Sequence, residues 1–265
     1  MKSEENYIEI NKQSWNNRTD VHIKSDFYDI DGFMEGKISL KSIELDLLGD
    51  VSGKSILHLQ CHFGQDTLSL SRMGAKVTGV DLSDNAIKVA KELTENLNVD
   101  AEFICCDLYD LPNHLNKTFD IVFTSYGTIG WLPDLDKWAA VVSKFLKSGG
   151  KFVFAEFHPV VWMFDDAFEK IEYNYFKNEA IETLEGSYTE STTDQEQQFI
   201  TWNHSLSEVL RSLLNNDLQI NSFNEYDYSP YNCFQKTIEF EPGKFRIEHL
   251  GNNIPMVYSL TATKI

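Results

Sequence analysis

Two aspartates and one tight turn stand where an α/β protein places the polar groups of a nucleotide site. Asp81 directly follows the apolar residues 76–80, and Asp107 follows the next expected strand. The turn lies within residues 55–67, where a short apolar run turns at Gly64 into a helix. A carboxylate at the first position can accept both hydroxyls of a ribose, and one at the second can accept the amine of an adenine. Each feature alone also fits a helix cap, but together they predict a site for an adenosine-containing ligand.

The turn has an unusual composition for such a site. Small residues are expected there, yet the chain has His58, Gln60 and His62. Backbone N–H groups at the start of a helix attract polar or anionic ligand groups. We therefore expect the ligand to contact this turn through Gln60, His62, Gly64 and Asp66. His58 has two interpretations, a histidine that is hydrogen-bonded at a strand edge or a contact to the ligand.

The spacing of apolar residues predicts the elements that position these side chains. Between residues 54 and 157, short apolar runs alternate with segments of helical periodicity. The expected strands are residues 56–59, 76–80, 101–106, 119–124 and 151–157. The expected helices are residues 65–73 and two helices capped by Ser83 and Asp134. This alternation predicts a doubly wound α/β fold with a mainly parallel sheet, and ligands at the carboxyl ends of its strands.

Two segments stand outside this alternation. Residues 1–50 read as a polar and aromatic N-terminal helical arm, which either packs on the core or acts as a lid. Residues 159–204 are aromatic and acidic, and they read as a partly β insertion after the fifth strand. A helix opened by Ser205 follows, and then two strands at residues 218–223 and 256–262. Because no helical segment separates these strands, we expect them to be antiparallel neighbours.

Four motifs and the final strand pair carry a resemblance to a known family. The motifs are Val80-Asp81-Leu82-Ser83, Cys106-Asp107-Leu108, Phe119-Asp120-Ile121-Val122 and Leu146-Lys147-Ser148-Gly149-Gly150. Through them the chain resembles the class I S-adenosylmethionine-dependent methyltransferases of the small-molecule branch, over residues 51–158 and 205–265. The resemblance implies a seven-stranded sheet of order 3-2-1-4-5-7-6 with strand 7 antiparallel, and S-adenosyl-L-methionine as cofactor. It also implies that Leu82 and Leu108, beside the two aspartates, contact the cofactor.

The chain departs from this family at the glycine-rich motif. The family pattern is an acidic residue followed by Gly-x-Gly-x-Gly, and only its last glycine, Gly64, is present here. The methionine end of the cofactor must then be held differently, with Gln60, Asp66 and the backbone near Gly64 as candidates. An NAD-dependent oxidoreductase is the less favoured alternative, because its glycines would fall on Gln60, His62 and Gln65.

The loop after the fourth strand, residues 124–134, is a candidate for the acceptor side. In the family this loop lines the site where the methyl group meets the acceptor. Ser125 and Tyr126 are therefore expected to lie at the cofactor and the acceptor. Trp131 either lines the same site or packs under the next helix.

Three segments are expected to cover the site: the arm at residues 1–50, the insertion at residues 159–204, and residues 226–245. Their aromatic side chains suit a small organic acceptor. In the family, similar arms close over the cofactor, so Trp15 and Arg18 are expected to contact it.

Glu156 and His158, at the end of the fifth strand, are expected to face the acceptor and, with Tyr126, are the candidate catalytic residues. A histidine with a near-neutral pKa can remove a proton from a hydroxyl or an amine. A histidine before proline at a strand end is also often only a polar edge residue. Methyl transfer from a sulfonium is an in-line displacement from an activated donor, so alignment of donor and acceptor is expected to contribute more than any base.

Composition limits the partners that we expect. The net charge of -18 disfavours nucleic acid and anionic membrane surfaces, and no apolar run is long enough to span a bilayer. Four cysteines form no C-x-x-C pair and the first residues lack a signal-peptide pattern, so we expect buried, reduced thiols in a cytoplasmic protein. No motif indicates a metal. The prediction is one domain over residues 1–265, a monomer or homodimer, that methylates a small organic acceptor; the alternative is a non-catalytic descendant that retains the fold for cofactor binding or regulation.

Overall fold

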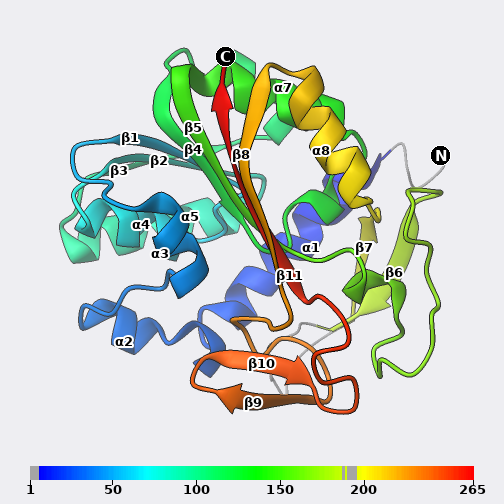
Figure 1. Ribbon diagram of the computed structural model, residues 1–265. Coiled ribbons are helices and arrows are strands. Elements are labelled where there is room, and N and C mark those ends of the chain that lie inside the picture. Colours follow the sequence, from blue (N-terminus) through cyan, green and yellow to red (C-terminus); the bar gives the residue numbers. More distant parts are fainter. Residues whose placement is uncertain (1–5, 187–188, 190–195) are drawn as a thin grey trace.

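A seven-stranded sheet forms the centre of the molecule (Figure 1). The computed structural model describes residues 6–186, 189 and 196–265. The strand order is β3-β2-β1-β4-β5-β11-β8, and β11 is antiparallel to both neighbours whereas the other pairs are parallel. The bounds are β1 Ser55–Leu59, β2 Lys76–Asp81, β3 Ala101–Cys105, β4 Phe119–Ser125, β5 Leu146–Phe157, β8 Leu218–Tyr226 and β11 Val257–Lys264. The predicted fold class, strand order and antiparallel last strand are confirmed.

Helices cover both faces of this sheet, because its strands are apolar on both sides. Successive residues of β4 show this: Val122 packs into one apolar cluster and Phe123 into another. The first cluster includes the helices α7 and α8, and the second includes α3 and α4, with α5 packed beside α4 (Figure 1). The bounds are α3 Ser42–Leu48, α4 Gln65–Arg72, α5 Asp84–Leu97, α6 Leu111–His114, α7 Leu135–Phe145 and α8 Leu206–Asn215.

The three predicted helix caps are confirmed. Ser83 accepts a hydrogen bond from the Ala86 backbone N–H at the start of α5. Asp134 does the same for α7, and Ser205 for α8. These side chains satisfy N–H groups that have no partner within their own helix. The helix starts are therefore set by local sequence, which explains why they could be predicted.

Three groups of elements lie beyond the carboxyl ends of the central strands (Figure 1). The arm contains α1 (Tyr7–His22) and α2 (Ile30–Met34), and α1 contacts both α5 and β7. The segment after β5 contains the antiparallel pair β6 (Ile181–Glu185) and β7 (Gln197–Thr201). A second hairpin, β9 (Thr237–Glu241) and β10 (Lys244–Ile247), follows β8. Across the described ranges, no helix combines the length and apolar character needed to cross a membrane.

Two expectations are corrected. β5 begins at Leu146 and not at residue 151, because Leu146 pairs with Phe119 directly after α7. The cysteines are free, but only Cys61 is fully buried: Cys106 and Cys233 are partly buried, and Cys105 is exposed. Cys105 lies on β3, an outermost strand of the sheet, where fewer neighbours cover a side chain.

Candidate cofactor and acceptor site

A large cavity lies at the carboxyl ends of the central strands, and residues of α1 and of the segments that follow β5 and β8 also line it. Its volume is about 1290 Å³, above the roughly 300–1,000 Å³ of most ligand pockets, so it can hold a cofactor and a second small molecule. The predicted site residues that line it are Trp15, Arg18, Gln60, His62, Gly64, Asp66, Asp81, Leu82, Asp107, Leu108, Ser125, Tyr126 and Glu156. Within the described part of the chain, His158 is the predicted residue that the lining does not include.

The turn after β1 has a strained backbone. Gln60 and His62 have φ values of 54° and 52°, in the left-handed region, which costs a side-chain-bearing residue roughly 1–2 kcal/mol. Gly64 has a φ of 82°, and a Cβ there would lie 2.7 Å from the Phe103 ring. The chain can therefore replace two glycines of the family motif but not the third. Strain of this kind persists where the surrounding structure holds it, and it concentrates at functional sites.

Asp81 joins this turn to the start of α5. Its Oδ2 accepts the His62 backbone N–H at 2.7 Å, and its Oδ1 accepts the Ser83 backbone N–H at 2.9 Å. Ser83 caps the helix, so Asp81 is not its cap. Burial raises the pKa of Asp81 to about 6, although the two hydrogen bonds oppose this rise. Because an ionised carboxylate has about four lone-pair positions, both oxygens can still accept hydroxyls from the cavity.

Asp107 occupies the corresponding place at the end of β3. Its side chain accepts the Tyr109 backbone N–H at 3.2 Å and so caps a short 3₁₀ turn at Leu108–Asp110. The capping interpretation therefore holds for Asp107, but the residue also lines the cavity, as do Leu82 and Leu108. Burial raises its pKa. The two apolar side chains and the carboxylate suit a flat base with an exocyclic amine.

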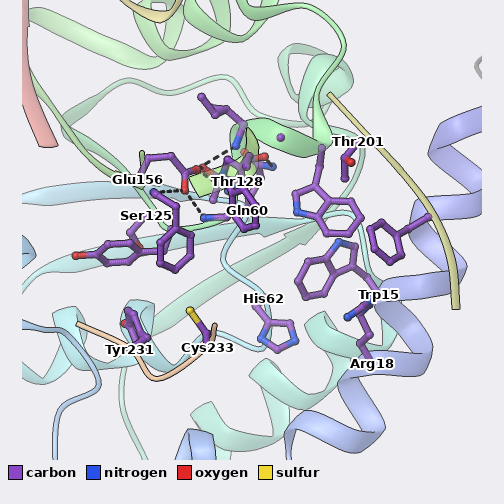
Figure 2. A pocket seen from close by; sticks show the side chains of 18 of the residues that line it. Trp15, Arg18, Gln60, His62, Ser125, Thr128, Glu156, Thr201, Tyr231 and Cys233 are labelled. Carbon is purple, nitrogen blue, oxygen red and sulfur yellow. Dashed lines mark hydrogen bonds between the residues drawn. The ribbon is translucent and has the colours of Figure 1, made fainter. Parts of the chain in front are cut away.

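Gln60 points from the turn toward the loop after β4 (Figure 2). Its Nε2 donates to the Thr128 carbonyl at 2.8 Å, whereas its buried Oε1 has no partner among the described residues. A buried acceptor of this kind requires a donor, and an ammonium group would supply one. Asp66 is near this turn, and its Oδ1 accepts the Ser39 hydroxyl at 2.5 Å. Burial raises the pKa of Asp66.

His58 is a hydrogen-bonded histidine at the edge of the site. Its Nδ1 lies 2.8 Å from the Thr67 hydroxyl, and its ring packs on Phe123. Burial lowers the pKa of His58 to about 3, so the ring is neutral. The hydrogen bond of the first interpretation is therefore present, and because the ring also borders the cavity, a contact to the ligand stays a prediction.

An aromatic cluster closes one side of the cavity (Figure 2). The Trp15 ring lies 5.3 Å from His62 and 5.1 Å from Trp131, measured between centroids. Trp131 therefore lines the cavity, as the first of its two interpretations predicts. The guanidinium of Arg18 lies 4.9 Å from the centre of the Phe199 ring. Side chains of α1 and β7 therefore contact each other beside the cavity.

The arm is fixed at both of its sides by asparagines. Asn11 is buried, and its amide both donates to and accepts from the backbone of Ile200 in β7, at 2.8 Å in each case. On the other side, Asn16 accepts the Ser83 hydroxyl at 2.7 Å and donates to Asp84 at 3.0 Å. α1 therefore spans the cavity from α5 to β7, which is the arrangement of a lid.

Glu156 positions the loop after β4 (Figure 2). Its buried carboxylate accepts backbone N–H groups from Gly127, Thr128, Ile129 and Phe157, and also the Thr128 hydroxyl. Burial raises the pKa of Glu156, and these hydrogen bonds oppose the rise. Five donors of its own chain thus use this carboxylate, which holds the loop, and its expected role toward the acceptor stays a prediction.

His158 does not line the cavity, contrary to the expectation that it faces the acceptor side. Its Nε2 lies 2.9 Å from Glu225 on β8, and its Nδ1 accepts the Val160 backbone N–H at 3.2 Å. The His158 backbone still pairs with Met256, next to β11. The ring is therefore directed across β11 and away from β4. The interpretation as a polar edge residue is correct.

Tyr126 follows β4 with a φ of 44°, and its ring borders the cavity. Its hydroxyl donates to Glu44 on α3 at 2.8 Å. Burial raises the pKa of Glu44 to about 7. The sequence did not single out Glu44, Lys41 or Tyr231. In the folded chain, Lys41 and Tyr231 line the cavity, and the Tyr231 ring also contacts Tyr126. Their sole signal was their place in segments expected to cover the site.

Comparison with known proteins agrees with this geometry. A family model described as a methyltransferase domain matches residues 56–150. A demethylmenaquinone methyltransferase of Lactococcus lactis is 35% identical over 49% of this chain and 52% of its own length. A ubiquinone biosynthesis O-methyltransferase of Coxiella burnetii is 31% identical over 44% of this chain and 49% of its own length. The chain thus spans about half the length of the curated relatives that it matches.

Solved structures share the fold. A geranyl diphosphate C-methyltransferase of Streptomyces coelicolor has a TM-score of 0.63 and 16% identity, with 98% of both chains covered. A putative S-adenosylmethionine-dependent methyltransferase of Listeria monocytogenes has a TM-score of 0.56 and 22% identity, covering 83% of this chain and 95% of its own. The domain match, the sheet order and the strand-end carboxylates lead to one conclusion. Residues 56–150 form a methyltransferase domain, and the chain shares the fold of solved S-adenosylmethionine-dependent methyltransferases.

Proposed function

We propose that this protein transfers the methyl group of S-adenosylmethionine to a small organic acceptor by in-line displacement. One observation carries the proposal: a single cavity joins Asp81 and Asp107, at two strand ends, to the aromatic surface around Tyr126. Cofactor and acceptor would therefore meet in one enclosed space.

The residues present suit the cofactor. Asp81 would accept the ribose hydroxyls and Asp107 the adenine amine, with Leu82 and Leu108 against the base. The unpartnered Oε1 of Gln60 offers an acceptor for the ammonium group. We assign three further contacts from the same lining, namely Asp66 and the backbone near Gly64 at the methionine end, and Ser125 beside them. Trp15 and Arg18 would close over the cofactor from α1.

The bound cofactor supplies a sulfonium methyl group that is already activated. The protein's contribution is then to align two reactants and exclude water, and such alignment can lower a barrier by about 7–11 kcal/mol. A proton transfer would add about 10²–10⁴-fold. The carboxylate of Glu156 and the ring of His158 are both occupied by their own chain, which favours alignment over base catalysis.

Methyl transfer is tested by incubating the protein with S-adenosylmethionine and a panel of aromatic and prenylated metabolites, and by measuring S-adenosylhomocysteine. The relatives named above concern quinones, so quinols belong in the panel. Acceptor-dependent product supports the proposal. Cofactor binding without product from any acceptor would favour the alternative, a binding or regulatory descendant, which the replaced glycines at Gln60 and His62 motivate.

A further inference from the structure

Five aromatic rings form a continuous wall on the acceptor side of the cavity, and we name this wall the acceptor chamber. Its members are Tyr126, Phe157, Trp162, Tyr231 and Phe234. Neighbouring rings have centroids 5.1–5.8 Å apart, from Tyr231 through Tyr126 and Phe157 to Trp162 and Phe234. These residues come from the loop after β4, the end of β5, and the segments after β5 and β8. A wall of ring faces and edges suits a flat, largely apolar molecule.

The Tyr126 hydroxyl and two polar side chains that line the same cavity, Glu156 and Cys233, offer no free proton acceptor. The Tyr126 hydroxyl donates to Glu44, behind the ring. The Glu156 carboxylate is held by the backbone of the loop after β4. Burial raises the pKa of the Cys233 thiol to about 12, so this thiol is neutral. The chamber therefore directs no free proton acceptor from these residues toward the acceptor molecule.

Lys41 brings a positive charge to the chamber. It lines the cavity, and its Nζ lies 4.9 Å from the centre of the Tyr231 ring. Two other lysines in the lining are neutralised, because Lys37 pairs with Asp29 at 2.7 Å and Lys236 with Glu169 at 2.6 Å. Among the described residues, no carboxylate lies within 4.0 Å of the Lys41 ammonium.

We propose that the methyl acceptor is a flat aromatic molecule that enters as an oxyanion, an ionised phenol or enol, and that Lys41 attracts this charge. The inference rests on the proposed function and specifies its acceptor. An oxyanion needs no base: an oxygen electron pair forms the new O–CH₃ bond, and the breaking C–S bond leaves its pair on sulfur. Both products are then uncharged at the reacting atoms, and no proton has to move. A cationic acceptor would instead be repelled by Lys41, although aromatic rings attract cations.

The test uses protein saturated with S-adenosylhomocysteine and three flat probes. The anionic probe is 6,8-difluoro-7-hydroxy-4-methylcoumarin at a pH where its hydroxyl is ionised, the neutral probe is 7-methoxy-4-methylcoumarin, and the cationic probe is N-methylquinolinium. The anionic probe should bind most tightly. Lys41→Met should weaken it on the order of 10-fold or more, the scale of a charge-assisted contact, and should leave the neutral probe unchanged. Lys37→Met, a paired lysine of the same lining, is the matched control and should change neither.

Three results would overturn the inference: equal binding of the anionic and neutral probes, tighter binding of the cation, or a loss of anion affinity in Lys37→Met equal to that in Lys41→Met. A fourth result, weaker binding of S-adenosylhomocysteine to Lys41→Met with probe affinity intact, would assign Lys41 to the cofactor's carboxylate and overturn the inference as well. Failure of the wild-type protein to bind S-adenosylhomocysteine would instead contradict the proposed function, so the two failures are distinguishable.

Discussion

The backbone N–H of His62 donates to Oδ2 of Asp81 at 2.7 Å. This contact joins the end of β1 to the end of β2, and it holds His62 in a left-handed conformation that its side chain disfavours. Asp81 thus maintains the turn while it keeps lone pairs for the cavity. The site of this chain is built on that link, and not on a run of glycines.

Replacing Asp81 with Ala should weaken binding of S-adenosylhomocysteine by about 1.5–3 kcal/mol, the scale of hydrogen bonds to a charged group. Isothermal calorimetry measures this directly. Asp100→Ala, which changes an exposed aspartate outside the cavity lining, is the control and should bind normally. Unchanged affinity in Asp81→Ala would refute the ribose role.

Cofactor affinity should fall as the pH drops through about 6. Burial raises the pKa of Asp81 to about 6, so below that pH the carboxylate is protonated and must lose its proton to accept hydroxyls from the ligand. One such proton weakens binding by at most about tenfold per pH unit. Calorimetry between pH 5 and pH 8 should show the fall in the wild type and a flat profile in Asp81→Asn.

A control for this profile is Glu44→Gln. Burial raises the pKa of Glu44 to about 7, and Glu44 lies behind Tyr126. The fall in affinity should persist in this variant. If cofactor affinity did not change with pH in Glu44→Gln but still fell at low pH in Asp81→Asn, the titrating group would be Glu44 and not Asp81.

Glu156→Gln should destabilise the fold by about 1.5–3 kcal/mol or more, because the amide presents a donor to the backbone N–H groups that the carboxylate accepts. Urea unfolding measures the loss.

His158→Gln should leave cofactor affinity and turnover unchanged, because that ring faces Glu225. If His158→Gln abolished turnover while still binding the cofactor, the assignment of His158 as an edge residue would be wrong.

Asn11→Ala should weaken cofactor binding on the order of tenfold, because it removes both hydrogen bonds that fix α1 to Ile200 and so lowers the fraction of closed lid. Calorimetry reports the affinity, and protease sensitivity of the arm reports the opening. Gln13→Ala changes an exposed residue of the same helix and should alter neither the cofactor affinity nor the protease sensitivity of the arm. A globally unfolded Asn11→Ala protein would show that the arm belongs to the core.

Much of the fold was predictable because local signals determine it. Ser83 and Asp134 mark helix starts, and the apolar runs before Asp81 and Asp107 mark strand ends. Since parallel strands end on the same edge of the sheet, the two carboxylates had to lie near each other. That reasoning needs no tertiary detail.

The acceptor side was less predictable because it depends on packing between distant segments. Glu44, Tyr126 and Tyr231 meet from α3, the loop after β4 and the segment after β8. Glu156 and His158 share a face of β5 by alternation, but the first reaches toward the loop after β4 and the second toward β8. No periodicity in the sequence distinguishes those two directions.

The most direct test of the central claim is calorimetric titration of the protein with S-adenosylhomocysteine, S-adenosylmethionine and NAD, repeated with Asp81→Ala. We predict that both adenosyl ligands bind one site, that NAD does not, and that the Asp81→Ala variant loses most of the affinity. Binding of neither adenosyl ligand, or binding of NAD in their place, would contradict the account.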